Sequence, residues 1–125
     1  MVKDKRPVNL DMLSIRQPIT AWASITHRAS GVFLFAGMAV LLWALDASLA
    51  SAESFAMLQT CLTSVWVKVV VWAVLAGLIY HSVAGVKHLI MDLGIGETMA
   101  GGILAARIVV GLSVILMLLA GLWIW

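Results

Sequence analysis

Residues 65–86, VWVKVVVWAVLAGLIYHSVAGV, decide the fold because they form an apolar run long enough to cross a lipid bilayer as one helix. A crossing takes roughly 20 residues at a rise of about 1.5 Å each. Residues 30–50 and 108–125 have the same character. The chain of 125 residues is 63% hydrophobic and 11% charged, and a soluble protein of this size could not bury so much apolar surface. We therefore predict an all-α membrane protein with three transmembrane helices.

A single membrane domain is expected over residues 1–125, because the sequence has no internal repeat and no low-complexity linker. Pro7 and Pro18 argue against a continuous helix in residues 1–20, which we expect to form a cytoplasmic segment. The glycine-rich residues 91–102, MDLGIGETMAGG, are expected to form the turn between the second and third spans. The spans themselves are predicted at approximately residues 24–50, 64–88 and 104–125.

Basic residues concentrate at one end of the predicted spans. Those at this end are Lys3, Lys5, Arg6, Arg16 and Arg28 before the first span, and Lys87 and Arg107 beside the turn between the other two. Only Lys68 lies at the opposite end. Positively charged loops stay on the cytoplasmic side, which predicts a cytoplasmic N-terminus and a C-terminus on the outer side. The net charge of +2 needs no nucleic-acid partner to explain it.

Cys61 is the only cysteine. The chain therefore forms no intrachain disulfide and no cluster of thiolate metal ligands. We expect Cys61 to lie in the loop between the first two spans as an inert side chain. Palmitoylation or an interchain disulfide are the alternatives.

His81 lies inside the second span, about 9 Å from its basic end by the helical rise. An imidazole at that depth is costly unless it is hydrogen-bonded or bound to a metal. One interpretation is a hydrogen bond to a neighbouring helix. The other is axial ligation of a haem iron. Gly85, one turn further, would then clear space for the porphyrin, and His88 and Lys87 would meet the haem propionates at the membrane surface.

A second polar group lies in ASITHRASG, residues 23–31. Ser24 and Arg28 are one helical turn apart and share a face, with His27 and Gly31 on the adjoining strip. Arg28 either extends to the membrane surface or binds a ligand oxygen, and Ser24 is either a helix-start hydroxyl or a further ligand contact. Both polar groups are expected at the same, cytoplasmic, depth. A haem and a pocket for a lipid-soluble quinone would then be neighbours, which suits electron transfer to the quinone.

A six-coordinate haem b needs two axial ligands, and His81 supplies one. His27 could supply the second, but we expect it nearer to the membrane surface than His81. A histidine from another membrane subunit is the preferred alternative. Three helices also make a thin wall around a porphyrin, so we expect the chain to form part of a heteromeric helix bundle.

Two sequence blocks closely resemble a known family. They are RPVNLDMLSIRQPITAWASITHRASG, residues 6–31, and YHSVAGVKHLIMDLG, residues 80–94. They resemble the cytochrome b556 large membrane-anchor subunits of bacterial succinate dehydrogenase, respiratory complex II, and the likeness covers almost the whole chain. The resemblance implies a multi-pass protein of the bacterial inner membrane, with its C-terminus in the periplasm. It further implies a role in respiratory electron transport and the tricarboxylic acid cycle.

The resemblance also implies roles for individual residues. The residue that matches His81 is one axial ligand of haem b, and a small membrane-anchor subunit supplies the other. The residues that match Ser24 and Arg28 line the ubiquinone site, and those that match His27, Arg28 and His88 lie near the haem propionates. The implied partners are the small anchor subunit, an iron–sulfur subunit, a flavoprotein subunit and membrane lipids, and a trimeric complex is left open.

The implied reaction starts with succinate oxidation at a flavin in a soluble subunit, from which electrons pass through iron–sulfur clusters to ubiquinone. Ser24 would donate a hydrogen bond to a quinone carbonyl, and Arg28 would stabilise the anions formed during reduction. This chain would do no carbon chemistry itself. The alternatives are the anchor subunit of a quinol:fumarate reductase, or a small non-redox transporter or structural anchor in which His81 and Arg28 belong to a proton or anion path.

Overall fold

The computed structural model describes residues 16–125. These residues form helices joined by short connections, with no strand in that range: α1 (Ile19–Ala50), α2 (Ala52–Leu62), α3 (Val65–Asp92) and α4 (Met99–Ile124). Most of the expected N-terminal segment, residues 1–20, lies outside the described residues. The first helix begins directly after Pro18, whose own φ of −67° and extended ψ suit the residue before a helix.

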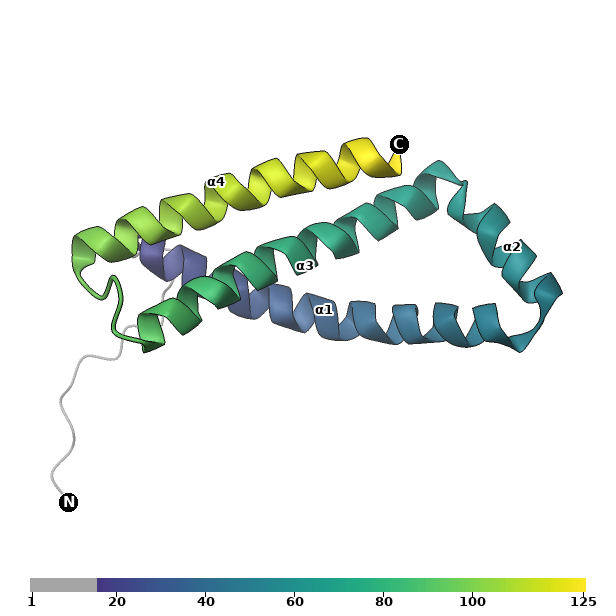
Figure 1. The fold of residues 1–125 in the computed structure, drawn as a ribbon, viewed down its shortest axis with the longest axis horizontal. Coiled ribbons are helices and arrows are strands. Elements are labelled where there is room, and N and C mark those ends of the chain that lie inside the picture. Colours follow the sequence, from purple (N-terminus) through teal and green to yellow (C-terminus); the bar gives the residue numbers. More distant parts are fainter. Residues whose placement is uncertain (1–15) are drawn as a thin grey trace, which may run out of the picture.

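Three of the helices lie lengthwise beside one another (Figure 1). α3 packs against both α1 and α4, and α1 also contacts α4. α1, α3 and α4 are all long and apolar enough to cross a membrane, with a mean hydropathy of 2.0, 2.0 and 2.6, respectively. The prediction of an all-α membrane protein with three spanning helices is confirmed.

The connection between α1 and α3 contains a helix, so the prediction of a loop between the first two spans is wrong. α2 runs from the end of α1 to the start of α3 and contacts both of these helices (Figure 1). It begins with a capping box, in which the Ser51 hydroxyl accepts a hydrogen bond from the Ser54 amide at 3.0 Å and the Ser54 hydroxyl accepts one from the Ser51 amide at 3.2 Å. These bonds satisfy amides that the start of a helix otherwise leaves without partners. Cys61 accordingly lies near the end of α2, as an exposed free thiol.

The turn between α3 and α4 is shorter than the expected stretch of residues 91–102. It contains Gly94 and Gly96, whose φ angles of +80° and +78° lie in the left-handed region that favours glycine. The Thr98 hydroxyl then caps α4 by accepting a hydrogen bond from the Gly101 amide at 3.1 Å. This cap explains why residues 99–102 already belong to the helix.

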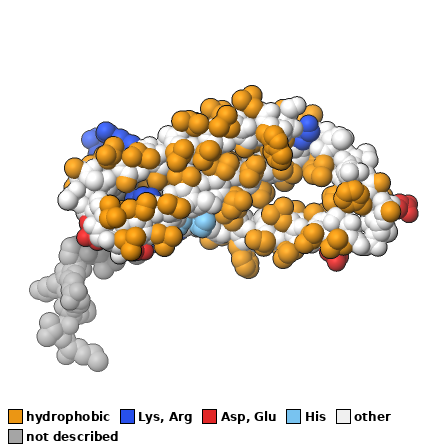
Figure 2. All heavy atoms as spheres, viewed as in Figure 1, with side chains coloured by type: hydrophobic (Ala, Val, Ile, Leu, Met, Phe, Trp, Pro, Cys, Tyr) orange, Lys and Arg blue, Asp and Glu red, His pale blue; other side chains and the backbone are white. Residues whose placement is uncertain are grey.

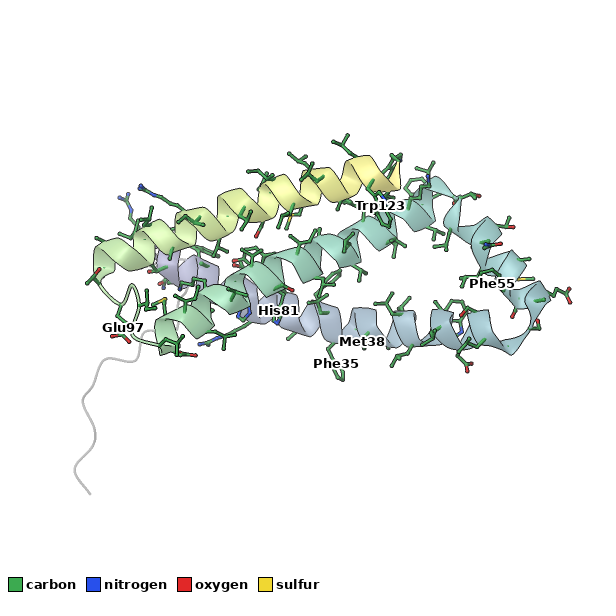
Figure 3. All side chains as sticks on the ribbon, in the orientation of Figure 1. Phe35, Met38, Phe55, His81, Glu97 and Trp123 are labelled. Carbon is green, nitrogen blue, oxygen red and sulfur yellow. The ribbon has the colours of Figure 1, made fainter. Side chains whose placement is uncertain are left out.

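Small residues form the contacts between the long helices. Ala23, Ala84, Ala106 and Ser113 are each at most 5% exposed, and small side chains allow helices to approach closely in a membrane. Large apolar side chains cover the outside instead (Figure 2). Phe35, for example, is 84% exposed and points away from the helices (Figure 3). Such a surface suits lipid or other membrane subunits, not water.

One polar link holds α3 to α4. The Trp72 indole Nε1 donates a hydrogen bond to the backbone carbonyl of Met117 at 3.0 Å. Gly121 makes room for the indole, because a Cβ at that position would lie 3.2 Å from Nε1. Another polar link joins α2 to α1, because the Ser54 hydroxyl donates to the backbone carbonyl of Ala47. The other side-chain hydrogen bonds between helices of the described residues lie between α1 and α3, and these belong to the site described next.

Candidate functional site

The Nδ1 atom of His81 faces two oxygen atoms of α1. It lies 3.0 Å from the hydroxyl oxygen of Ser30 and 3.2 Å from the backbone carbonyl oxygen of His27. The Ser30 hydroxyl donates its own hydrogen to that same carbonyl at 2.7 Å. Both oxygens are therefore acceptors toward His81, so Nδ1 carries the ring hydrogen and Nε2 keeps a free lone pair.

The free lone pair matters for metal ligation. A neutral imidazole binds iron through one nitrogen while the other nitrogen donates to a carbonyl or a similar acceptor. His81 has this arrangement, at the place where α3 passes close to α1 (Figure 3). His81 is thus hydrogen-bonded to a neighbouring helix, which was one of the two interpretations of its position in the sequence. Because this bond uses Nδ1, the Nε2 atom stays available to ligate a haem iron, which was the other interpretation.

His27, His81 and His88 together form a column of imidazole rings, which we call the histidine column. The rings of His27 and His81 are stacked, with centroids 4.2 Å apart and planes inclined by 14°. The rings of His27 and His88 have centroids 5.1 Å apart and are tilted by 40°. His27 therefore lies beside His81 and between it and His88. The sequence alone instead predicts a position for His27 nearer to the membrane surface than that of His81.

The stacking of His27 on His81 bears on whether both histidines could ligate the same haem iron. Two histidines that ligate one haem iron do so from opposite faces of the porphyrin, with the macrocycle between them. His27 and His81 are stacked face to face at 4.2 Å, which leaves no room for a ring between them. In this arrangement the pair cannot clamp a haem.

Two glycines border the histidine column. A Cβ at Gly85 would lie 3.5 Å from Nε2 of His27, and a Cβ at Gly31 would lie 3.1 Å from Cε1 of His81. The first distance is ordinary contact, so Gly85 leaves room for little more than a methyl group there. The second is tight, so Gly31 is what lets the His81 ring approach α1. The sequence placed Gly31 on the same strip as His27, but gave no sign that it faces His81.

The histidine column also has an unsatisfied nitrogen. Nε2 of His27 is buried and has no hydrogen-bond partner among residues 16–125. A buried polar atom without a partner costs about 1–3 kcal/mol. A haem offers both an iron for the free nitrogen of His81 and anionic propionate oxygens for an imidazole N–H. The donor set of these residues therefore fits a haem.

Ser24 and Arg28 both lie on α1, as expected for residues that share a face. Ser24 is half-buried and Arg28 is exposed. Arg28 directly follows His27 in the chain, so this polar pair lies beside the histidine column.

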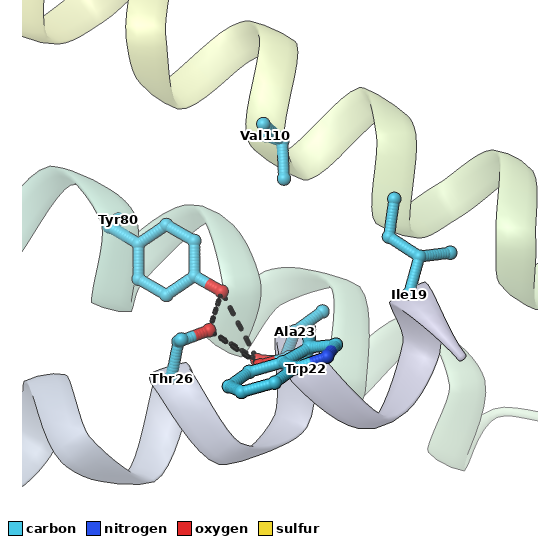
Figure 4. Close-up of a pocket in the computed structure, with 6 residues that line it drawn as sticks. All are labelled: Ile19, Trp22, Ala23, Thr26, Tyr80 and Val110. Carbon is cyan, nitrogen blue, oxygen red and sulfur yellow. Dashed lines mark hydrogen bonds between the residues drawn. The ribbon is translucent and has the colours of Figure 1, made fainter. Parts of the chain in front are cut away.

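A third polar group, which the sequence did not single out, joins α1 to α3 beside the histidine column, through residues on the same side of α1 as His27 and Ser30. The Tyr80 hydroxyl is hydrogen-bonded to the Thr26 hydroxyl and donates to the backbone carbonyl of Ala23 at 3.1 Å (Figure 4). These residues border an apolar hollow of about 370 Å³. The available signal was a tyrosine directly before His81 in an apolar run, because a buried phenol usually finds a hydrogen-bond partner.

Comparisons with known proteins agree with this architecture. The family described as the succinate dehydrogenase/fumarate reductase transmembrane subunit matches residues 2–120. The succinate dehydrogenase cytochrome b556 subunit of Coxiella burnetii is 44% identical over 122 residues, which cover 97% of this chain and 98% of that protein. The subunit of the same name from Paracoccus denitrificans is 31% identical over 75% of this chain and 72% of that protein. The one from Rickettsia felis is 28% identical over 98% and 94%, respectively.

Proposed function

The chain belongs to the succinate dehydrogenase/fumarate reductase transmembrane subunit family, and we propose that it is the large anchor subunit of a succinate:ubiquinone oxidoreductase, holding haem b and one wall of the quinone site. Membership in this oxidoreductase family and a multi-pass location in the inner membrane follow from the match and the three apolar helices. The residue roles below are part of the proposal.

The observation that carries the haem proposal is the hydrogen bonding of His81. Its Nδ1–H is held by two acceptors on α1, which leaves Nε2 free to ligate iron. When bound, the haem supplies an iron that takes up and releases one electron at a time. A small anchor subunit would supply the other protein ligand, because the rings of His27 and His81 are stacked and leave no room for a haem between them.

His27 and His88 would bind the propionates. The buried Nε2 of His27 lacks a partner, and a propionate oxygen would satisfy it with a charge-assisted hydrogen bond. His88 is the third member of the histidine column and directly follows Lys87 in the chain. It would therefore bind the same anionic propionate groups of the haem as His27. Gly85 would keep the space beside His27 free of a side chain.

Ser24 and Arg28 would bind ubiquinone. Their positions one turn apart on α1 let the hydroxyl donate to a quinone carbonyl while the guanidinium stabilises the negative charge that reduction creates. Iron–sulfur and flavoprotein subunits would dock at this end of the chain and deliver the electrons from succinate. This chain orients the quinone and does no carbon chemistry.

The haem proposal is tested on the purified complex. We expect a b-type α band in the reduced-minus-oxidised spectrum, and we expect His81→Ala to weaken or abolish it. Ser82→Ala is the matched control, because Ser82 is the next residue of α3 and is exposed. A wild-type complex without an α band would contradict the haem proposal and favour a non-redox anchor. An unchanged band in His81→Ala would overturn the ligand assignment.

The remaining alternative within the family is a quinol:fumarate reductase anchor, since the family description covers both enzymes. The relatives named above are all succinate dehydrogenase subunits, which favours the succinate-oxidising direction. Measured preference of the complex for ubiquinone over menaquinone separates the two alternatives.

A further inference from the structure

Ser30 is a residue to which neither the sequence nor the family comparison assigned a role. It lies on α1, three residues after His27, and its hydroxyl is half-buried against His81. A serine in a helix often donates to a carbonyl of the preceding turn, and Ser30 does so toward His27 at 2.7 Å. That bond uses its only hydrogen and aims a lone pair at Nδ1 of His81, 3.0 Å away.

We propose that Ser30 is a positioning residue for the haem iron, acting through His81, and this inference rests on the haem-binding function proposed above. An acceptor on the N–H of a ligating imidazole fixes the tautomer and the rotation of the ring and increases the basicity of the ligating nitrogen. A more basic ligand stabilises ferric over ferrous iron, so the hydrogen bond lowers the midpoint potential of the haem.

Two other parts of α1 assist in this arrangement. The carbonyl oxygen of His27 is the second acceptor, at 3.2 Å from Nδ1. Gly31 has no side chain to block the ring, since a Cβ there would lie 3.1 Å from Cε1 of His81. Ser30 is the only one of the three groups that a substitution can remove without changing the backbone or the space around the ring.

Ser48 shows what is specific about Ser30. It lies on the same helix and its hydroxyl donates to the Leu45 carbonyl, also at 2.7 Å and also three residues back. Ser48 makes this local bond only, whereas Ser30 adds the contact with Nδ1 of His81. Ser48→Ala therefore removes the same local hydrogen bond without touching His81, and is the matched control.

The test uses the intact complex, purified with Ser30→Ala, Ser30→Thr, Ser48→Ala or no substitution. Haem content is measured first, then the midpoint potential by optical titration and the low-spin ferric spectrum by electron paramagnetic resonance. Threonine keeps the hydroxyl and can make the same bond to the preceding turn. We expect Ser30→Ala to retain haem with a higher midpoint potential and shifted ferric signals, and Ser30→Thr and Ser48→Ala to match the unsubstituted complex.

Three results would overturn the proposal. The first is an unchanged midpoint potential and ferric spectrum in Ser30→Ala with haem bound. The second is a shift of the same size in Ser48→Ala. The third is a shift of the same size in Ser30→Thr, which keeps the hydroxyl. If Ser30→Ala loses haem altogether, retention in Ser30→Thr supports the proposal and loss in both overturns it. Failure of the haem-binding function itself would be distinct, because the unsubstituted complex would then contain no haem.

Discussion

The imidazole rings of His27 and His81 are stacked with their centroids 4.2 Å apart, although the two residues lie on different helices. The stacking joins what the sequence presented as two separate polar groups, one in the first span and one in the second. It places the nitrogen of His27 that lacks a partner beside the imidazole whose Nε2 is free.

Substitution of His27 should weaken haem binding without removing the iron ligand. His27→Ala deletes the imidazole but keeps the backbone carbonyl that accepts from His81. A lost hydrogen bond to a charged group costs about 1.5–3 kcal/mol, which corresponds to roughly tenfold to a hundredfold weaker binding. We expect a b-type spectrum with lower haem occupancy after purification. Complete loss of the α band would instead indicate that His27 ligates the iron.

Gly85 should tolerate a methyl group but not a long side chain. A Cβ there would lie 3.5 Å from His27 Nε2, so Gly85→Ala is expected to keep most of the haem, whereas Gly85→Leu would fill the space and lower haem occupancy severalfold. Gly111→Leu is the control, because a Cβ at Gly111 meets nothing within 4 Å. Equal haem content in the two leucine variants would contradict the role of Gly85 in haem binding.

Arg28 should be required for quinone reduction and not for succinate oxidation. We expect Arg28→Ala to lower succinate:quinone activity at least tenfold, because the positive charge that stabilises reduced quinone is lost, while reduction of an artificial dye by succinate is preserved. Arg107→Ala removes an exposed basic residue of α4 and should leave both activities intact. If Arg28→Ala lowers both activities equally, assembly of the complex and not the quinone site is affected.

Tyr80 should contribute to helix packing and not to haem binding. Tyr80→Phe removes the hydroxyl that donates to the Ala23 carbonyl at 3.1 Å. Hydrogen bonds between membrane helices contribute about 0.6 kcal/mol on average, so we expect a small decrease in the thermal midpoint of the purified complex and an unchanged haem spectrum. A shifted α band would contradict this prediction and show that the hydroxyl affects the haem.

Much of the fold could be predicted from the distribution of apolar residues along the sequence. Three apolar runs of sufficient length determine three spanning helices, because a lipid bilayer forces each run to satisfy its backbone hydrogen bonds within itself. α2 was missed although its signal is local: Ser51 and Ser54 form the capping box, with serine at the position where glutamate or glutamine is usual.

The candidate residues His27, His81, His88, Ser24 and Arg28 could also be selected from the sequence, and Gly85 followed from its place one turn after His81. A polar side chain within an apolar run is costly and therefore conspicuous, whatever it contacts. Their roles remain proposals, because the chemistry of each depends on a haem or a quinone.

Only the tertiary structure decided which side chains meet. Sequence periodicity orients a helix when one face is apolar and the other polar, but α1 and α3 are apolar around most of their circumference. Their rotation is determined by the close approach of small residues such as Ala23 and Ala84. That packing brings Ser30, Gly31 and His27 against His81, because the positions of small side chains on both helices, and not the polarity of either one, determine which faces can come into contact.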